Sequence, residues 1–93
     1  MNQSLTIHRP MLSDHVRYRW DELRRQHQLV FPEGLLVLND TGAAIVKCCD
    51  GRPTAELIAT LKEEFDDEPP ESEVVEFLQR LAGKGHVHDA ADS

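Results

Sequence analysis

Residues 28–51, QLVFPEGLLVLNDTGAAIVKCCDG, contain the change from strand to helix that decides the fold. Residues 28–31 are β-prone and a proline stops them. Residues 32–34, Pro-Glu-Gly, have the chemistry of a tight turn, because proline fixes φ and glycine can take positive φ. Residues 35–38 form a second apolar run. This part of the stretch therefore predicts two antiparallel strands joined by a short turn.

A short helix is predicted directly after these strands. Residues 39–41 are Asn, Asp and Thr, which are all good N-cap residues, and they precede the run Ala43–Cys49. Gly51 suits the left-handed position that follows a helix, so Asp50-Gly51 is expected to end it after about two turns.

Another strand is predicted upstream, over Val16–Trp20. Apolar and charged residues alternate there, which is the period-two pattern of a half-buried strand, so Val16, Tyr18 and Trp20 are expected to face the core. Together the three strands form an antiparallel meander. Residues 1–13 have no clear period and are interpreted as a flexible N-terminal arm that could include a short edge strand.

Two longer helices are predicted downstream. Thr54 can cap the first, and its apolar face carries Leu57, Ile58, Leu61 and Phe65. Pro69-Pro70 begins the second, and Gly83 or Gly85 ends it. The apolar stripe of this last helix consists of Val74, Phe77, Leu78 and Leu81.

This order of elements predicts a single α+β domain of winged-helix type. A three-stranded antiparallel sheet is followed by a three-helix bundle, with a short C-terminal strand at residues 86–88. We expect the folded domain to span residues 14–88, and residues 89–93 to form a disordered tail. A chain of 93 residues has room for one small core.

The charge distribution excludes two classes of partner. The net charge is −7, and residues 32–93 hold five basic against fourteen acidic side chains. Such a surface repels nucleic acids and anionic membranes, because both bind through clustered Lys and Arg. No segment has the ~18 apolar residues of a membrane span, and no apolar signal sequence begins the chain. With two adjacent cysteines, Cys48 and Cys49, we expect a cytoplasmic protein with reduced thiols.

No catalytic, cofactor or metal constellation is present. His86-x-His88 has a spacing that zinc tolerates, but no third and fourth ligand follows at a recognisable distance. Cys48 and Cys49 lie at the end of a predicted helix, where a thiolate is disfavoured, so a buried and inert pair is expected. We therefore predict no enzyme activity, no cofactor and no metal.

The sequence instead offers a surface beside the strand at residues 35–38. If this strand lies at the sheet edge, its free N–H and C=O groups can pair with an extended peptide. Side chains of the last helix would supply pockets, with Val75 and Arg80 lying off the apolar stripe. The candidate peptide-binding residues are Leu35, Leu36, Val37, Leu38, Asn39, Val74, Val75, Leu78, Arg80 and Leu81.

Several of these motifs in this order resemble the PqqD family of pyrroloquinoline quinone (PQQ) biosynthesis. They are Leu29-Val30-Phe31-Pro32-Glu33-Gly34, then Leu38-Asn39-x-Thr41, Cys49-Asp50-Gly51 and Thr54-x-Glu56-Leu57-Ile58. The resemblance covers residues 14–88. Gly42 in the first turn of a helix and the polar Lys47 depart from the expected pattern, which bears on local stability rather than on the groove.

The resemblance implies a winged-helix-like domain without catalysis of its own. It implies a peptide chaperone that captures the precursor peptide PqqA as an added strand, between the third strand and the third helix. The captured peptide is then presented to the radical-SAM enzyme PqqE. Related domains are recognition elements for precursors of ribosomally synthesised and post-translationally modified peptides (RiPPs).

The same residues leave two alternative functions open and predict one kind of assembly. A winged-helix DNA-binding regulator is the alternative function, but residues 71–84 hold three Glu against Arg80 and Lys84, the reverse of a recognition helix. A small enzyme or metal carrier built on the histidines and cysteines is a second alternative. Finally, an exposed strand edge allows strand pairing or exchange between two copies, so a homodimer is expected at high concentration.

Overall fold

The computed structural model of the protein describes residues 7–65 and 69–92. It confirms an α+β fold with a three-stranded antiparallel sheet, three helices and a C-terminal strand. In chain order the elements are β1 (Pro10–Leu12), β2 (Arg17–Asp21), β3 (Gln26–Phe31), β4 (Gly34–Leu38), α1 (Asp40–Lys47), α2 (Thr54–Glu64), α3 (Glu71–Gly83), β5 (Val87–Asp89) and a 3-10 turn at Ala90–Asp92.

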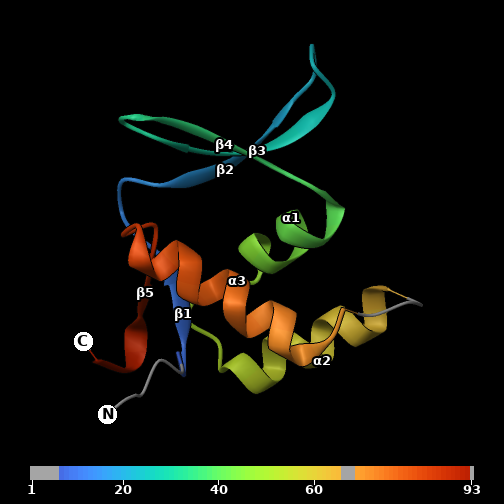
Figure 1. The fold of residues 1–93 in the computed structure, drawn as a ribbon, viewed down its shortest axis with the longest axis vertical. Coiled ribbons are helices and arrows are strands. Elements are labelled where there is room, and N and C mark those ends of the chain that lie inside the picture. The colour runs from blue at the N-terminus through green and yellow to red at the C-terminus, as the bar shows by residue number, and fades with distance from the viewer. Residues whose placement is uncertain (1–6, 66–68, 93) are drawn as a thin grey trace.

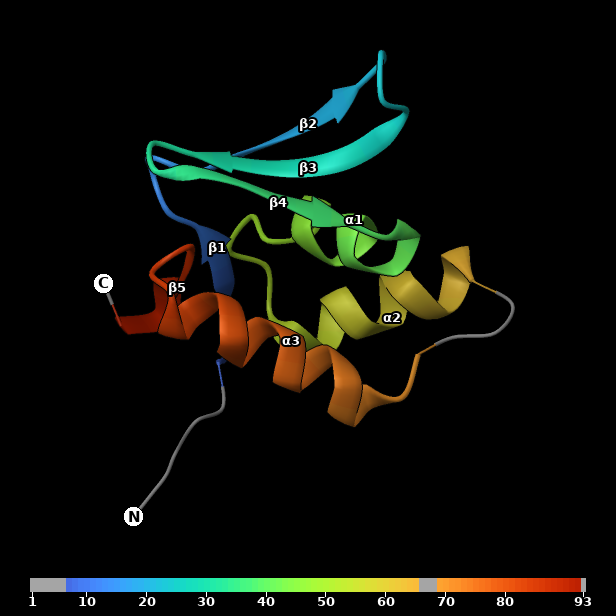
Figure 2. The ribbon, with the colours of Figure 1, turned by 45° about the horizontal axis from the view of Figure 1, so that its top comes forward.

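The strands form two separate antiparallel sheets. The larger has the order β2-β3-β4, which leaves β4 at an edge, and the smaller joins β1 to β5. The three helices lie on one side of the larger sheet, while the β2–β3 hairpin extends beyond them (Figure 1). In Figure 2 β4 lies above α1 and α3, and α3 runs in the opposite direction to β4.

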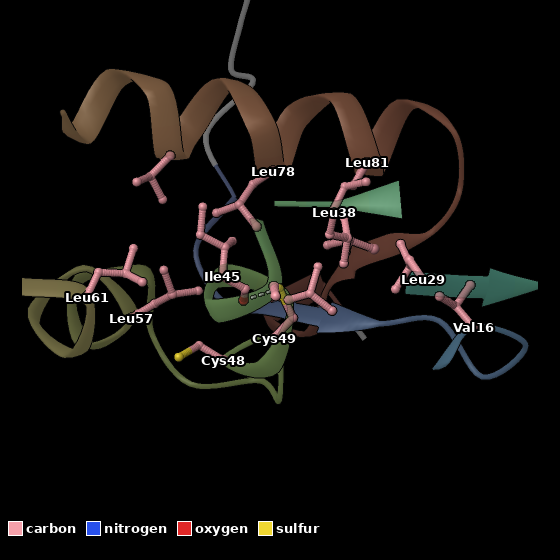
Figure 3. Packing of buried hydrophobic residues seen from close by; sticks show 14 residues of the cluster. Val16, Leu29, Leu38, Ile45, Cys48, Cys49, Leu57, Leu61, Leu78 and Leu81 are labelled. Atoms are coloured by element: carbon pink, nitrogen blue, oxygen red, sulfur yellow. Dashed lines mark hydrogen bonds between the residues drawn. The ribbon is translucent and has the colours of Figure 1, made fainter. Parts of the chain in front are cut away.

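The core fills the space between the inner face of the sheet and the helices. Leu29 of β3 is fully buried, as is Leu57 of α2, and Leu78 and Leu81 of α3 are each 1% exposed. In Figure 3 they belong to one continuous cluster that extends from α2 beneath α3 to the strand that carries Leu29. Fully burying a leucine contributes about 1.5–3 kcal/mol, so this cluster holds the three helices against the sheet.

Local hydrogen bonds define the ends of the helices. Among the three expected candidates it is Asn39 that caps α1, because its side-chain oxygen accepts the Gly42 N–H at 2.7 Å. Gly85, at φ 80°, ends α3 in a Schellman motif, in which the His86 N–H reaches the Leu81 carbonyl. Thr54 does not cap α2, since its hydroxyl donates to the Ile7 carbonyl instead.

The two chain ends are more ordered than expected. The predicted flexible arm, residues 1–13, includes strand β1, which pairs with β5 and buries Pro10. The predicted disordered tail, residues 89–93, includes the end of β5 and the 3-10 turn. Asp89 holds the two chain ends together, because its carboxylate accepts the N–H groups of His8, Arg9 and Ala91. Residues 1–6 and 93 lie outside the described residues.

Trp20 lies on the same face of the sheet as Tyr18 and the buried Leu29, as predicted, but it is not part of the core, since this side chain is 42% exposed. Trp20 lies in the part of the β2–β3 hairpin that no helix covers, and its indole N–H donates to Glu22. The neighbouring Asp21 is buried on the opposite face of the sheet, with its carboxylate accepting the backbone N–H groups of Arg24 and Leu23. The Arg24 N–H lowers the pKa of this carboxyl most strongly.

Candidate functional site

A groove of about 1080 Å³ lies between β4 and α3, closed at one end by the first turn of α1 and by Pro69 and Pro70. We call it the β4–α3 groove. Its walls are apolar at depth, where Leu38, Val74 and Leu81 are nearly fully buried and Phe77 is half-buried. Its rim on α3 is charged and exposed, with Glu73, Glu76, Arg80 and Lys84.

The open edge of β4 forms the other rim. Phe31 and Gly34 pair across a two-residue turn, so theirs is a hydrogen-bonded pair of the β3–β4 ladder. Because bonding alternates along a strand, Leu36 bonds to β3 while Leu35 and Val37 direct their N–H and C=O groups to the outside. Among the described residues no backbone group bonds to these outward groups.

The positions of α1 and the sheet are linked beside this groove. The Tyr18 hydroxyl and His27 Nδ1 share a hydrogen bond of 2.7 Å, and His27 Nε2 lies 3.1 Å from the Asp40 carboxylate at the start of α1. At the other end of α1, the Lys47 ammonium lies 4.8 Å from the centre of the Tyr18 ring. These contacts fix α1 against the sheet, which fixes the closed end of the groove.

Most of the predicted peptide-binding residues do come together in the groove. Those that line it are Leu36, Val37, Leu38, Asn39, Val74, Arg80 and Leu81. Leu35, Val75 and Leu78 do not. Leu35 is 50% exposed on the outer face of the sheet, Leu78 is buried in the core, and Val75 lies half-buried on another side of α3. Which of these residues contact a peptide stays a prediction.

Sequence reasoning missed part of the lining. The additional lining residues are Thr41, Gly42, Ile45, Pro69, Pro70, Glu73, Glu76, Phe77 and Lys84. Phe77 belonged to the apolar stripe of α3 and was assigned to the core alone. The signal for the charged rim was its spacing, because residues 73, 76, 80 and 84 recur every three or four positions on one side of a helix.

The structure also explains the glycine at position 42. A Cβ atom there would lie 3.1 Å from the Asn39 Oδ1 that caps the helix, and 3.4 Å from Cζ of Phe77. The absence of a side chain lets the first turn of α1 approach α3 closely. Glycine has a lower helix propensity than alanine, but at position 42 it permits the close packing of α1 against α3.

The cysteines and histidines have no reactive geometry. Cys48 and Cys49 are buried, free thiols, and burial raises the pKa of both, that of Cys49 to about 12. His86 is buried against the Phe31 ring, with ring centres 4.2 Å apart, and burial lowers its pKa. His88 is exposed. Residues 7–65 and 69–92 contain no group of three or more His, Cys, Asp or Glu placed to hold a metal ion.

No helix in the described part of the chain is long and apolar enough to cross a lipid bilayer.

Comparison with known proteins places the chain in a family. The model of the family described as Coenzyme PQQ synthesis protein D (PqqD) matches residues 26–87. The PqqA binding protein of Azotobacter vinelandii is 39% identical over 72 residues, which is 75% of this chain and 78% of that protein. The PqqA binding protein of Rhodopseudomonas palustris strain HaA2 is 36% identical over 87 residues, which is 90% of this chain and 85% of that protein.

A solved structure agrees with the sequence matches. It is the solution NMR structure of the PqqD truncation of Methylobacterium extorquens PqqCD, described as a functional and stand-alone RiPP recognition element. It superposes with a TM-score of 0.71 at 32% identity, over 86% of this chain and 88% of that chain. The fold and the matched sequence agree, and the chain belongs to the PqqD family.

Proposed function

We propose that this protein binds the precursor peptide PqqA in PQQ biosynthesis, holding it as an extra strand on β4 within the β4–α3 groove. The relatives named PqqA binding proteins and the structural relative described as a RiPP recognition element support this function. The observation that carries it is the open edge of β4 facing an apolar groove.

The geometry suits capture of an extended chain. Leu35 and Val37 together offer two donors and two acceptors, and each net hydrogen bond contributes about 0.5–1.5 kcal/mol. These main-chain bonds supply affinity that does not depend on peptide sequence. The apolar depth of the groove, at Leu38, Phe77 and Leu81, then receives alternate peptide side chains and supplies specificity.

The protein then acts on the peptide by holding it, without bond-making chemistry of its own. We infer that it presents bound PqqA to the radical-SAM enzyme PqqE. The bound segment is fixed in an extended conformation, which reduces the entropy that the enzyme complex has to remove from the peptide. The two free thiols agree with action in the reducing cytoplasm.

The test is titration of PqqA into ¹⁵N-labelled protein, with amide shifts read by NMR. Saturable shifts are expected at residues 35–39 and 72–82, and a peptide of scrambled sequence should not produce them. Saturable shifts confined to a different face would reject the site. The absence of shifts both with and without PqqE would reject the function.

Presentation to PqqE requires a separate experiment. The rate of PqqA modification by PqqE is measured with and without this protein. Acceleration is expected, and it should saturate at the protein concentration that saturates PqqA. A rate that does not depend on this protein would contradict presentation while leaving peptide capture intact.

A further inference from the structure

The register that β4 imposes on an incoming strand is fixed by its short edge. Only Leu35 and Val37 direct backbone groups outward, so an added antiparallel strand is bonded through two of its own residues, one opposite each. Directly opposed residues share a face of the sheet. The peptide residues opposite Gly34, Leu36 and Leu38 therefore lie on the other face, which is the face that looks toward α3.

The charged rim of α3 has a definite polarity along that face. Phe77, the middle residue of α3, lies beside Gly42 and therefore at the Leu38 end of β4. His86, just after α3, stacks on Phe31 beside Gly34, at the opposite end of β4. The helix and the strand thus run antiparallel, as Figure 2 also shows.

This arrangement places opposite charges at the two ends of the groove. Glu73 and Glu76 flank the Leu38 end, and Arg80 and Lys84 flank the Gly34 end. All four side chains are exposed, and within residues 7–65 and 69–92 none of them takes part in an ion pair. The apolar Phe77 and Leu81 line the groove beside these charges.

We propose that the β4–α3 groove selects a peptide segment of the pattern basic–x–apolar–x–acidic, read from its N-terminus, through the charge polarity of α3. This inference rests on the proposed strand addition. An antiparallel strand enters with its N-terminal end at Leu38, so its first inward residue meets Glu73 and Glu76. Its middle inward residue enters the apolar part of the groove between Phe77 and Leu81, and its last meets Arg80 and Lys84.

Two synthetic peptides of identical composition test the pattern. Each has thirteen residues, with the central segment KTLTE in one and ETLTK in the other, flanked by Gly and Ser. Both compete with fluorescent PqqA for the protein. Because exposed charge pairs contribute modestly, the KTLTE peptide is expected to bind on the order of tenfold more tightly. The preference should shrink at 0.5 M NaCl, where such pairs are screened.

Charge-reversal variants locate the preference on α3. Arg80→Glu should lower the affinity for the KTLTE peptide and raise the affinity for the ETLTK peptide, so the preference for KTLTE falls or inverts. Arg17→Glu is the matched control, since Arg17 is exposed on β2 and does not line the groove. This variant should prefer the KTLTE peptide as strongly as the wild type does. Circular dichroism confirms that each variant is folded. If Arg80→Glu does not fold, the wild type provides the test. A KTLTE preference that does not shrink at 0.5 M NaCl would then overturn the charge pattern.

The outcomes separate this inference from the function beneath it. Equal affinity for the two peptides, failure of both to compete with bound PqqA, or a preference that Arg80→Glu leaves unchanged would each overturn the charge pattern alone. Failure of PqqA itself to bind would overturn the proposed function, and this inference with it.

Discussion

Val37 is the residue at which the proposed strand addition can be tested without disturbing the sheet. Its N–H points away from β3, so Val37→Pro removes no ladder hydrogen bond, and proline is tolerated at such edge positions. The ring also blocks the approach of another strand. We expect Val37→Pro to lower PqqA affinity at least about tenfold, because one hydrogen bond is lost and its neighbours are strained.

Val37→Thr is the matched control, because it keeps the N–H and nearly the same side-chain shape. Affinity is measured by fluorescence anisotropy and stability by thermal unfolding. The Tm of Val37→Pro should remain within a few degrees of that of Val37→Thr. Unchanged PqqA affinity in the proline variant would exclude pairing at this edge.

The limits of sequence reasoning are visible at single residues. The alternation in Val16–Trp20 correctly placed Val16 inside, but it could not show that the hairpin extends past the helices and leaves Trp20 exposed. Periodicity identifies the faces of a strand and says nothing about where the covering layer stops. The position of Phe77 in the groove was missed for a related reason. An apolar stripe indicates which face of a helix is buried, but it does not show that a groove opens along that face.

At the scale of elements, the β1–β5 pair depends on one carboxylate. Burial opposes ionisation of Asp89, but the backbone N–H groups of His8, Arg9 and Ala91 outweigh it and lower the pKa of Asp89. Its stabilisation is therefore complete above the ordinary aspartate pKa and is lost as pH falls through the lowered value. We expect Asp89→Asn to destabilise the fold by about 1 kcal/mol at pH 7.

Urea unfolding across a pH series checks this. The difference in free energy of unfolding between wild type and Asp89→Asn should narrow as the medium becomes acidic. Asp14→Asn is the control, because Asp14 is an exposed aspartate in the loop after β1. A difference that stays constant with pH would show that the Asp89 charge is not what secures β1.

The larger elements and a short C-terminal strand were predictable from local patterns, whereas the pairing of that strand with β1 was not. Alternation identified β2, two apolar runs around a turn identified β3 and β4, N-cap residues identified α1, and helical spacing identified α2 and α3. β1 and β5 have three residues each and lie more than seventy positions apart in the chain. No local pattern shows that two such distant short strands pair, because only the folded core brings them together.

At the scale of the whole molecule, we expect the open edge of β4 to create a competition between peptide binding and self-association. An unpaired strand edge is a template for any extended chain, including β4 of a second copy. In an antiparallel pair of β4 strands, each edge offers its groups at Leu35 and Val37 to the other. Such a dimer buries only a short edge, so it should form at high concentration and dissociate on dilution.

The dimer and the peptide complex therefore require the same surface. Sedimentation over a concentration series should show a monomer–dimer equilibrium, and saturating PqqA should shift it to monomers. Val37→Pro should abolish dimerisation and PqqA binding together, which a dimer formed elsewhere would not do. A chain that stays monomeric at every concentration, or a dimer that binds PqqA without dissociating, would show that β4 is not shared between the two interactions.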